Sequence, residues 1–314
     1  MKSSFKKILF ITCCENGFYC LKRIYEKKFD IAYVVTLSPN AAKKLNISGY
    51  VDISNWCEKK KIKIKILNSY DLQITDLKGL EYDLIIVNGW SRLIKKEIID
   101  SSSSGMIGLH AGHPPIGHGR APIPWNIILN FEDIEVYTFK ANNKADDGDI
   151  IFKQTVEITP FDNARILYEK VMYVGSNLIE KSINCIDKNE EFQKQDKNLS
   201  VFYNKRTEKD SYVNFNQKCN DIYNFIRALS SPYPHAFSFF NDRKVEFIEA
   251  IPFDRFLFRD KIKNPGQVLE VLPSGLIIQT QDYPILIKKF KSQKKTYEHP
   301  LPSKIYQWKN KLFK

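Results

Sequence analysis

The 314-residue sequence lacks two common motifs by which proteins bind nucleotide phosphates. No Gly-x-Gly-x-x-Gly follows its first predicted strand, and no Walker A sequence occurs anywhere in the chain. Both motifs present backbone N–H groups to phosphates, so their absence argues against a bound dinucleotide and against a P-loop NTPase. The sequence also contains no internal repeat.

Long apolar runs and paired cysteines are missing as well. The apolar stretch at residues 8–11 is too short for a signal sequence, and no stretch is long enough to span a membrane. The six cysteines show no paired metal-binding spacing: Cys13, Cys14, Cys20, Cys57, Cys185 and Cys219. We therefore expect free thiols in a reducing compartment, a cytoplasmic location and no membrane partner.

The composition is that of a globular protein, but the charged residues are distributed unevenly along the chain. Apolar residues make up 43% of the chain and charged residues 27%, and the length suits one large domain or two modest ones. The formal net charge is +12, of which residues 288–314 contribute +8 through nine lysines and a single acid, Glu298. We interpret this tail as solvated and partly docked through its aromatic residues, with RNA binding as the alternative.

The first half of the sequence alternates short β-branched runs with amphipathic stretches. Strands are predicted at residues 8–12, 31–37, 62–67 and 84–87. The last of these is a continuous apolar run, typical of a strand buried on both faces of a sheet. We expect a Rossmann-like, open and mostly parallel α/β sheet. A long helix capped by Asp162 should follow, and then a polar linker at residues 187–198.

Beyond this linker the pattern changes to short strands separated by turn residues. Strands are predicted at residues 236–240, 244–251, 267–272, 276–280 and 285–290, after one helix at 222–229. This pattern predicts a small β-rich, barrel-like (OB-like) domain, although a sheet flanked by helices would look similar. We place one domain at residues 1–197 and the β-rich domain, with the basic tail, at 198–314.

Three of the five histidines, His110, His113 and His118, fall within nine residues of a loop rich in proline and glycine. The loop follows a predicted strand, and a helix should begin after it at Pro122 or Pro124. Loops at strand ends carry the sites of open α/β sheets, so we expect a site here. Zinc is the rival interpretation, but no cysteine lies nearby and helical ligand spacing is absent, so we expect no metal.

An acidic turn, Asp146-Asp147-Gly148, lies between strands predicted at residues 135–140 and 150–158. Taken alone, it indicates a polar hairpin turn, since Asp-Gly is a strong hairpin signal.

Together, the histidine loop and this turn resemble the folate-dependent formyltransferases, whose pattern is N-x-H-x-S-x-L-P-x-x-R-G-x-A-P followed by D-x-G. The matching residues are Gly108-Leu109-His110, Pro115, Gly119, Ala121, Pro122 and Asp146-Asp147-Gly148, with 36 residues from His110 to Asp146. Residues 202–211 and 226–237 look like the C-terminal domain of the nucleotide-sugar N-formyltransferase branch, which is related to methionyl-tRNA formyltransferase. Residues 1–197 would then be the catalytic domain.

The resemblance implies transfer of a formyl group from 10-formyltetrahydrofolate to an amine. His110 would stabilise developing negative charge or carry a proton, because imidazole titrates near neutral pH, and Asp146 would accept the proton of the amine. A hydrogen-bonded core histidine is the structural alternative for His110. The positions that match the folate site are Gly89, Trp90, Ser91, Asp147 and Gly148. Trp90 is expected to be core or pocket wall rather than a specific contact.

Two departures from the family pattern affect this assignment. The family asparagine is Gly108 here, and losing such a donor typically costs about 10²–10³ in rate when nothing replaces it. We expect Asn88 or, second, His113 to replace it, although an Asn-Gly turn is an equal alternative for Asn88. The family arginine is His118, with Arg120 two residues later, and we expect His113 and Arg120 to contact substrate.

For the acceptor we favour a nucleotide-linked amino deoxy sugar, dTDP-, UDP- or GDP-linked, as a precursor of a surface glycan such as lipopolysaccharide. Residues 36–50 are short and carry two lysines, unlike the basic insertion of the tRNA enzymes. Arg206 and Tyr203 would bind pyrophosphate and base, the alternative for Arg206 being a salt bridge with Asp210. Formylation of methionyl-tRNA and, because of Gly108, non-catalytic binding of folate or nucleotide sugar remain alternatives. The resemblance also implies a homodimer formed through the C-terminal domain.

Overall fold

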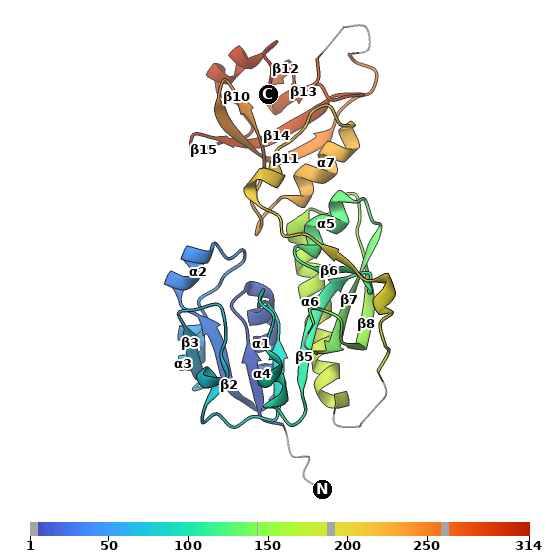
Figure 1. The fold of residues 1–314 in the computed structure, drawn as a ribbon. Coiled ribbons are helices and arrows are strands. Elements are labelled where there is room, and N and C mark those ends of the chain that lie inside the picture. Colours follow the sequence, from blue (N-terminus) through green and yellow to red (C-terminus); the bar gives the residue numbers. More distant parts are fainter. Residues whose placement is uncertain (1–5, 143, 187–191, 259–263) are drawn as a thin grey trace. The chain divides into compact units, whose positions relative to one another are not determined.

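The computed structural model describes residues 6–142, 144–186, 192–258 and 264–314, which form two compact units (Figure 1). The first unit comprises Met1–Pro122, Asp133–Glu157 and Leu167–Asn204, and the second comprises Ile123–Glu132, Ile158–Ile166 and Lys205–Lys314. Residues 187–191 of the predicted linker lie outside the described residues.

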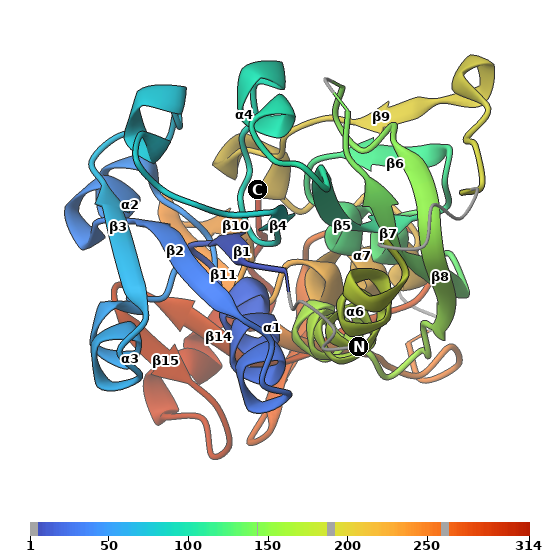
Figure 2. The same ribbon diagram turned by 90° about the horizontal axis from the view of Figure 1, so that it is seen from below.

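A seven-stranded sheet in the order β3-β2-β1-β4-β5-β7-β8 forms the centre of the first unit (Figure 2). Its strands are β1 (Ile8–Ile11), β2 (Ile31–Leu37), β3 (Lys63–Leu67), β4 (Leu84–Val87), β5 (Met106–Gly112), β7 (Asp133–Lys140) and β8 (Asp149–Glu157). Strands β3, β2, β1, β4 and β5 are parallel, whereas β7 and β8 pair antiparallel. The prediction of an open, mostly parallel sheet is confirmed.

Helices cover both faces of this sheet because side chains alternate along each strand. Ile8 and Phe10 of β1 lie in one buried cluster, together with residues of the helices on that face. Those helices are α1 (Glu15–Glu26), α3 (Ser54–Lys59) and α6 (Ala164–Cys185). Leu9 and Ile11 lie in a second cluster with residues of α2 (Pro39–Leu45) and α4 (Lys96–Asp100). Burial on both faces explains the continuous apolar runs in the sequence.

Helix α6 is capped by a different residue from the one predicted. Asn163 Oδ1 accepts a hydrogen bond from the Ile166 N–H at 3.0 Å, the geometry of an N-cap. The carboxylate of Asp162 instead accepts from the Thr159 N–H at 2.8 Å and closes the preceding turn. The prediction of Asp162 as the cap was therefore wrong by one residue.

The histidine loop contains a strand that the sequence did not predict. Strand β6 (Ile116–Gly119) pairs in parallel with β9 (Val201–Tyr203), which follows the predicted linker. Helix α5 (Pro122–Ile128) then begins at the first of the two prolines proposed.

The second unit contains an antiparallel sheet in the order β10-β11-β14-β13-β12, with β15 paired to β14. Its elements are α7 (Cys219–Ala228), β10 (Ala236–Phe240), β11 (Arg243–Pro252), β12 (Val268–Leu272), β13 (Gly275–Ile278), β14 (Ile285–Ser292) and β15 (Lys295–Tyr297). The five predicted strands and the helix are confirmed within a few residues, and β15 is additional.

The C-terminal segment connects the two edges of this sheet. The Asn310 N–H donates to Val268 O on edge strand β12, and the Lys314 N–H donates to Phe239 O on β10, at 2.8 and 2.9 Å. The chain end thereby gives the sheet a barrel-like closure, and the tail is part of the fold rather than a loose extension.

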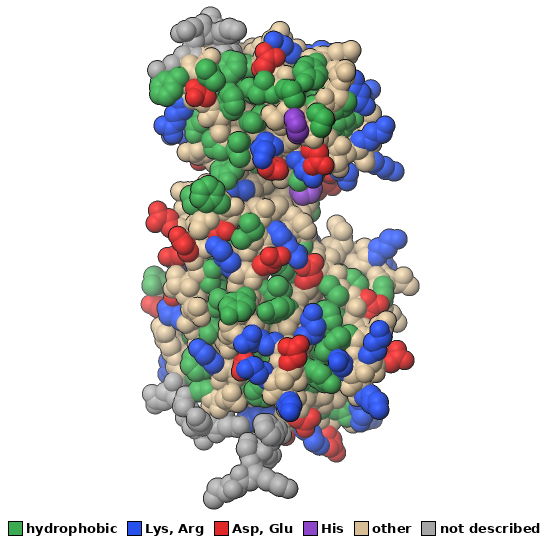
Figure 3. Space-filling view, turned by 180° about the vertical axis from the view of Figure 1, so that it is seen from behind, with side chains coloured by type: hydrophobic (Ala, Val, Ile, Leu, Met, Phe, Trp, Pro, Cys, Tyr) green, Lys and Arg blue, Asp and Glu red, His purple; other side chains and the backbone are tan. Residues whose placement is uncertain are grey.

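Five of the nine lysines in residues 288–314 form ion pairs. The pairs are Lys288–Glu249, Lys289–Glu298, Lys291–Glu246, Lys309–Glu270 and Lys314–Asp242. Four of these acids lie outside the tail, so folding brings negative charge to a segment that appears strongly basic in the sequence. On one face of the molecule, acidic side chains lie among the lysines and arginines (Figure 3).

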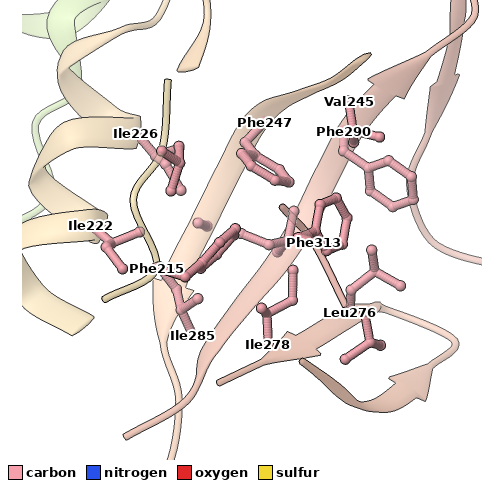
Figure 4. Packing of buried hydrophobic residues seen from close by; sticks show 14 of the residues in the cluster. Phe215, Ile222, Ile226, Val245, Phe247, Leu276, Ile278, Ile285, Phe290 and Phe313 are labelled. Carbon is pink, nitrogen blue, oxygen red and sulfur yellow. The ribbon is translucent and has the colours of Figure 1, made fainter. Parts of the chain in front are cut away.

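Aromatic rings fill the core of the second unit (Figure 4). Phe313, near the chain end, is 3% exposed, and its ring centroid lies 5.0 Å from that of Phe240 and 5.6 Å from that of Phe247. Ile222 and Ile226 of α7 are buried in the same cluster. All six cysteines of the protein are free thiols and buried. Among the described residues, no helix has both the length and the apolar character needed to cross a membrane.

Candidate active site

His110 and Asp146, predicted from separate segments, lie together in the first unit. His110 is on β5, and Asp146 is in the turn that joins β7 to β8. His110 Nδ1 is 3.7 Å from Asp146 Oδ2, with side chains 10% and 19% exposed. His110 Nε2 lies 3.0 Å from Gly117 O. A carbonyl only accepts, so Nε2 carries a hydrogen, and a second proton on Nδ1 would face the carboxylate.

Asp146 is held in an unusual backbone conformation. Its φ of +55° lies in the left-handed region, which residues other than glycine adopt uncommonly. Its Oδ2 accepts a hydrogen bond from the Gly119 N–H at 3.0 Å. Strand β6 therefore contacts both members of the pair, His110 through Gly117 and Asp146 through Gly119.

Gln195 and Tyr137 also belong to this region, although no sequence motif marks either residue. Gln195, 8% exposed, donates from Nε2 to Asp146 O and Gly148 O at 2.8 and 2.7 Å. The Tyr137 ring centroid is 5.8 Å from that of His110, and its buried hydroxyl has no hydrogen-bond partner among the described residues. Burial, followed by the negative charges of Asp146 and Glu135, raises the pKa of Tyr137 well above its usual value.

The position of the family asparagine is filled by an aromatic ring. Gly108 on β5 pairs directly with Phe139 on β7. A Cβ built on Gly108 would lie 2.3 Å from Phe139 Cζ, closer than two carbon atoms can approach. The glycine is therefore required by Phe139, and an asparagine side chain does not fit beside this ring.

The two residues predicted to replace that asparagine have other contacts. Asn88, 3% exposed, accepts from Asn16 Nδ2 at 3.0 Å and donates to Asn16 O at 3.3 Å, which joins the end of β4 to α1. His113 Nε2 lies 3.1 Å from Asp133 O. A donor role for either residue stays a prediction.

His118, third in the histidine loop, is fully buried. Its Nε2 is 3.0 Å from Gln195 Oε1, and its ring meets that of Phe202 edge-on at 5.3 Å. Burial lowers the pKa of His118, which favours the neutral imidazole. His118 is thus a structural member of the site.

The positions matched to the folate site lie at the carboxyl end of β4 and in the Asp-Gly turn. Trp90, 9% exposed, packs against Tyr70 with ring centroids 4.7 Å apart, as expected of core or wall. Ser91 donates its N–H to Tyr70 Oη at 2.5 Å and accepts from Arg120 Nη2 at 2.8 Å. Two predicted site residues, Ser91 and Arg120, are thus in contact.

The remaining matched positions are tightly enclosed. Gly89 has a φ of +77°, and a Cβ there would lie 2.6 Å from Asn16 Oδ1. Asp147 is 5% exposed, and its carbonyl accepts from Asn142 Nδ2 at 3.2 Å. A Cβ on Gly148 would lie 2.0 Å from Lys140 O.

A pocket of about 540 Å³ lies at this edge of the sheet, within the size range of ligand sites. It is bounded by α2, by the segment after β3 and by the segment after β4. Lys44 and Arg92 supply two positive charges against the single negative charge of Asp71, and Leu45 and Tyr70 supply apolar surface. The pocket suits an anion attached to an apolar or aromatic body.

Tyr203 and Arg206 fall in different units. Tyr203 is on β9, and burial raises its pKa. In the second unit, the Arg206 guanidinium lies 4.8 Å from the Trp125 ring centroid and 5.5 Å from that of Phe225. Arg206 Nη2 bonds to the carbonyl of Asp210, whereas the Asp210 carboxylate accepts from Thr207. Arg206 thus contacts Asp210 through the backbone carbonyl and not through the side-chain salt bridge that was the alternative to a binding role.

The histidines are not arranged as a metal centre. In the part of the chain that the structure describes, no group of three or more His, Cys, Asp or Glu side chains could hold a metal ion.

Two family models cover most of the chain. The model described as formyl transferase matches residues 6–183, and the model of the formyl transferase C-terminal domain matches residues 205–300. Methionyl-tRNA formyltransferase of Fusobacterium nucleatum is 29% identical over 299 residues, which cover 92% of this chain and 93% of that protein.

Two solved structures share the fold. WlaRD, described as a sugar 3N-formyl transferase in the presence of dTDP and 5-N-formyl-THF, has a TM-score of 0.66 and 20% identity, covering 93% of this chain and 100% of that chain. The N-formyltransferase of Helicobacter canadensis, in complex with folinic acid and dTDP-3-aminofucose, has a TM-score of 0.64 and 19% identity, covering 90% and 98%. At these identities the likeness establishes the fold.

Proposed function

This chain belongs to the formyl transferase family, and from that membership we propose that it transfers a formyl group from 10-formyltetrahydrofolate to the amine of a nucleotide-linked amino sugar. We extend the proposal to a cytoplasmic enzyme that makes a surface-glycan precursor and pairs through its C-terminal domain. Residues 1–197 would form the catalytic domain and residues 198–314 the second domain.

The residues of the first unit are suited to hold such a donor. The pocket beside Tyr70 combines apolar surface with Lys44 and Arg92, which match an aromatic body that ends in carboxylates. Gly89, Trp90, Ser91, Asp147 and Gly148 would line the approach from this pocket towards His110. When bound, the donor supplies the formyl group and the nitrogen from which it leaves.

His110 and Asp146 would perform the proton chemistry. An amine that attacks a formyl carbon must lose a proton, and the leaving nitrogen must gain one. Asp146, with its carboxylate oxygen 3.7 Å from His110 Nδ1, would accept the first proton. The protonated imidazole would stabilise the negative charge that develops on the formyl oxygen and deliver the second proton.

We choose a nucleotide sugar over RNA as the acceptor because lysines of residues 288–314 form ion pairs within the protein. An RNA acceptor needs a row of cations for its phosphates, whereas a nucleotide sugar needs only a few. Five of the nine tail lysines bind acidic side chains of the protein itself. Residues 36–50, all described, form short α2 and contribute only Lys43 and Lys44. Both observations support a small anionic acceptor, with Arg206 and its two aromatic neighbours as a binding element.

Methionyl-tRNA is the second candidate acceptor. The similarity of the chain to methionyl-tRNA formyltransferase of Fusobacterium nucleatum, over 92% of its length, favours it. The overall charge of +12 is also compatible with RNA.

One assay separates these functions. Purified full-length protein is given 10-formyltetrahydrofolate with either a panel of dTDP-, UDP- and GDP-linked amino sugars or methionine-charged initiator tRNA, and release of tetrahydrofolate is measured. Turnover with a sugar and none with tRNA is the expected result. Turnover with tRNA alone would replace the proposed acceptor, and folate binding without turnover on any acceptor would contradict the enzyme assignment.

A further inference from the structure

The amide of the Gln195 side chain contacts both the Asp-Gly turn and His118 on β6. Its Nε2 donates to Asp146 O at 2.8 Å and to Gly148 O at 2.7 Å. Two carbonyl acceptors identify this atom as the nitrogen, so Oε1 faces His118 and must accept from its Nε2–H at 3.0 Å. All hydrogen-bonding groups of the amide are thus used inside the protein.

His118 links this amide to the catalytic pair through its neighbours on β6. Gly117, before it, presents its carbonyl to His110 Nε2 at 3.0 Å, and Gly119, after it, donates its N–H to Asp146 Oδ2 at 3.0 Å. His118 itself is fully buried beside Gln195. Gln195 therefore joins the backbone of Asp146 to β6, and β6 in turn contacts the side chains of His110 and Asp146.

The segment that carries Gln195 is fixed on both sides. Gln193 exchanges two backbone hydrogen bonds with Ile150 at the start of β8, at 2.8 and 3.1 Å. After Gln195, β9 pairs in parallel with β6. The segment that carries Gln195 is therefore fixed to the start of β8 on one side and to β6 on the other, which holds the amide between the Asp-Gly turn and His118.

Asp146 needs such support because its backbone is unfavourable. A φ of +55° in a residue with a side chain typically costs of order 1–3 kcal/mol and persists where surrounding contacts hold it. At a separation of 3.7 Å, a displacement of about 1 Å would disrupt the contact between His110 and Asp146, and such displacements can cost about 100-fold in rate.

We propose that Gln195 is a positioning residue that sets the distance between Asp146 and His110. The inference rests on the proposed function for its effect on turnover, and on geometry alone for its effect on the histidine. In this role Gln195 acts through the backbone carbonyl of Asp146 and through His118, and not on the substrate.

The test compares Gln195→Met and Gln195→Glu with wild type, and Gln193→Ala is the matched control. Methionine keeps the length but removes every hydrogen bond, and glutamate places an oxygen against two carbonyls. Gln193, in the same segment, pairs with Ile150 through its backbone, which an alanine keeps. Thermal melting of each variant establishes that it folds. Turnover is measured from pH 5.5 to 9 with the acceptor that wild type uses.

A second readout does not depend on activity. The NMR chemical shifts of the His110 ring are recorded at a fixed pH in each full-length variant, with His110→Ala used to assign its resonances among the five histidines. These shifts respond to the surroundings of the ring even if no acceptor is formylated.

We expect kcat to fall about 30- to 100-fold in both Gln195 variants, with KM for the folate changed less than threefold. The pH–rate profile and the chemical shifts of the His110 ring should both differ from those of wild type. In combination with Asp146→Asn, Gln195→Met should add little further loss. A folded Gln195→Met protein whose His110 ring has wild-type chemical shifts would overturn the proposal. Absence of turnover in wild type, together with altered His110 chemical shifts in Gln195→Met, would count against the proposed function only.

Discussion

At the scale of single residues, the proposed chemistry depends on one imidazole and one carboxylate. We expect His110→Ala and Asp146→Asn each to lower kcat by about 10²–10⁴, because each removes a proton-transfer group. Steady-state turnover and thermal melting of both variants provide the measurement. His299→Ala, which changes an exposed histidine of the second unit, is the control. A His110→Ala protein with full turnover would disprove this assignment.

The pairing of Gly108 with Phe139 makes a stability prediction. Gly108→Ala should destabilise the protein by about 1–3 kcal/mol, because its Cβ overlaps the Phe139 ring, which is 5% exposed. Phe139→Ala alone should cost about 3–5 kcal/mol. In the double variant the clash is gone, so the combined loss in urea unfolding should be smaller than the sum by at least about 1 kcal/mol. Additive losses would show that the backbone relaxes around the alanine.

His118 makes the stability of the protein depend on pH. Burial lowers its pKa in the folded state below the usual value of about 6.5, so the unfolded chain binds more protons between the two values. The contribution of neutral His118 is complete above about pH 6.5 and is lost as the pH falls towards the folded value. Urea unfolding at pH 7.5 and 5.5 should show a smaller pH effect in His118→Gln than in wild type. An identical pH effect would mean that His118 is not the responsible group.

Sequence reasoning located the residues whose chemistry is distinctive and missed those that only support them. The histidine loop indicated a site because it follows a predicted strand, but Asp146 was paired with His110 only through the resemblance to the formyltransferases, since the Asp-Gly turn alone indicates a hairpin. Gln195 could not be predicted, because its partners lie 47 to 77 residues away and a glutamine in a polar stretch indicates a linker. Asn88 was located correctly at the end of β4, but its contact with Asn16 across 72 residues is invisible in sequence.

At the scale of secondary structure elements, periodicity was sufficient for the two main sheets. Strands β2 and β4 match their predicted bounds: β4 is an uninterrupted apolar run, β2 is interrupted only by Thr36, and both are covered on both faces. Strands β6 and β9 are four and three residues long and lack such a run. Each forms by pairing with the other, and the two strands lie some 80 residues apart in the sequence. The local pattern of residues therefore cannot predict this pairing.

The chain end behaves as an element of the second unit. Phe313 packs against Phe215, Phe240, Phe247 and Trp308 and is 3% exposed, so Phe313→Ala should lower the free energy of unfolding by about 3–5 kcal/mol. Urea unfolding gives the measurement. Leu312→Ala is the control, because the neighbouring Leu312 is 49% exposed and should change stability by less than about 1 kcal/mol. Equal effects of the two substitutions would show that the aromatic core does not depend on the tail.

At the scale of the whole molecule, a net charge of +12 indicates nucleic-acid binding when the composition is considered alone. The ion pairs of the fold reduce the positive charge that is available to phosphates. Exposed ion pairs add little to stability, but each neutralises a lysine that would otherwise attract phosphate. Five of the tail lysines are paired in this way. The chain is therefore basic in composition, while the segment that carries most of the excess presents far less positive charge than its sequence indicates.

Three exposed tail lysines, Lys294, Lys295 and Lys311, test whether the remaining charge matters for the acceptor. With a nucleotide-sugar acceptor, replacing all three by glutamine should change kcat/KM by less than about twofold, because a pyrophosphate needs few cations. An RNA acceptor would lose about one unit of log–log salt slope for each phosphate contact removed. The measurement is kcat/KM between 50 and 300 mM KCl for wild type and the triple variant. A steep salt slope in wild type that flattens in the variant would favour RNA, because only a polyphosphate chain releases many counterions when these lysines bind it.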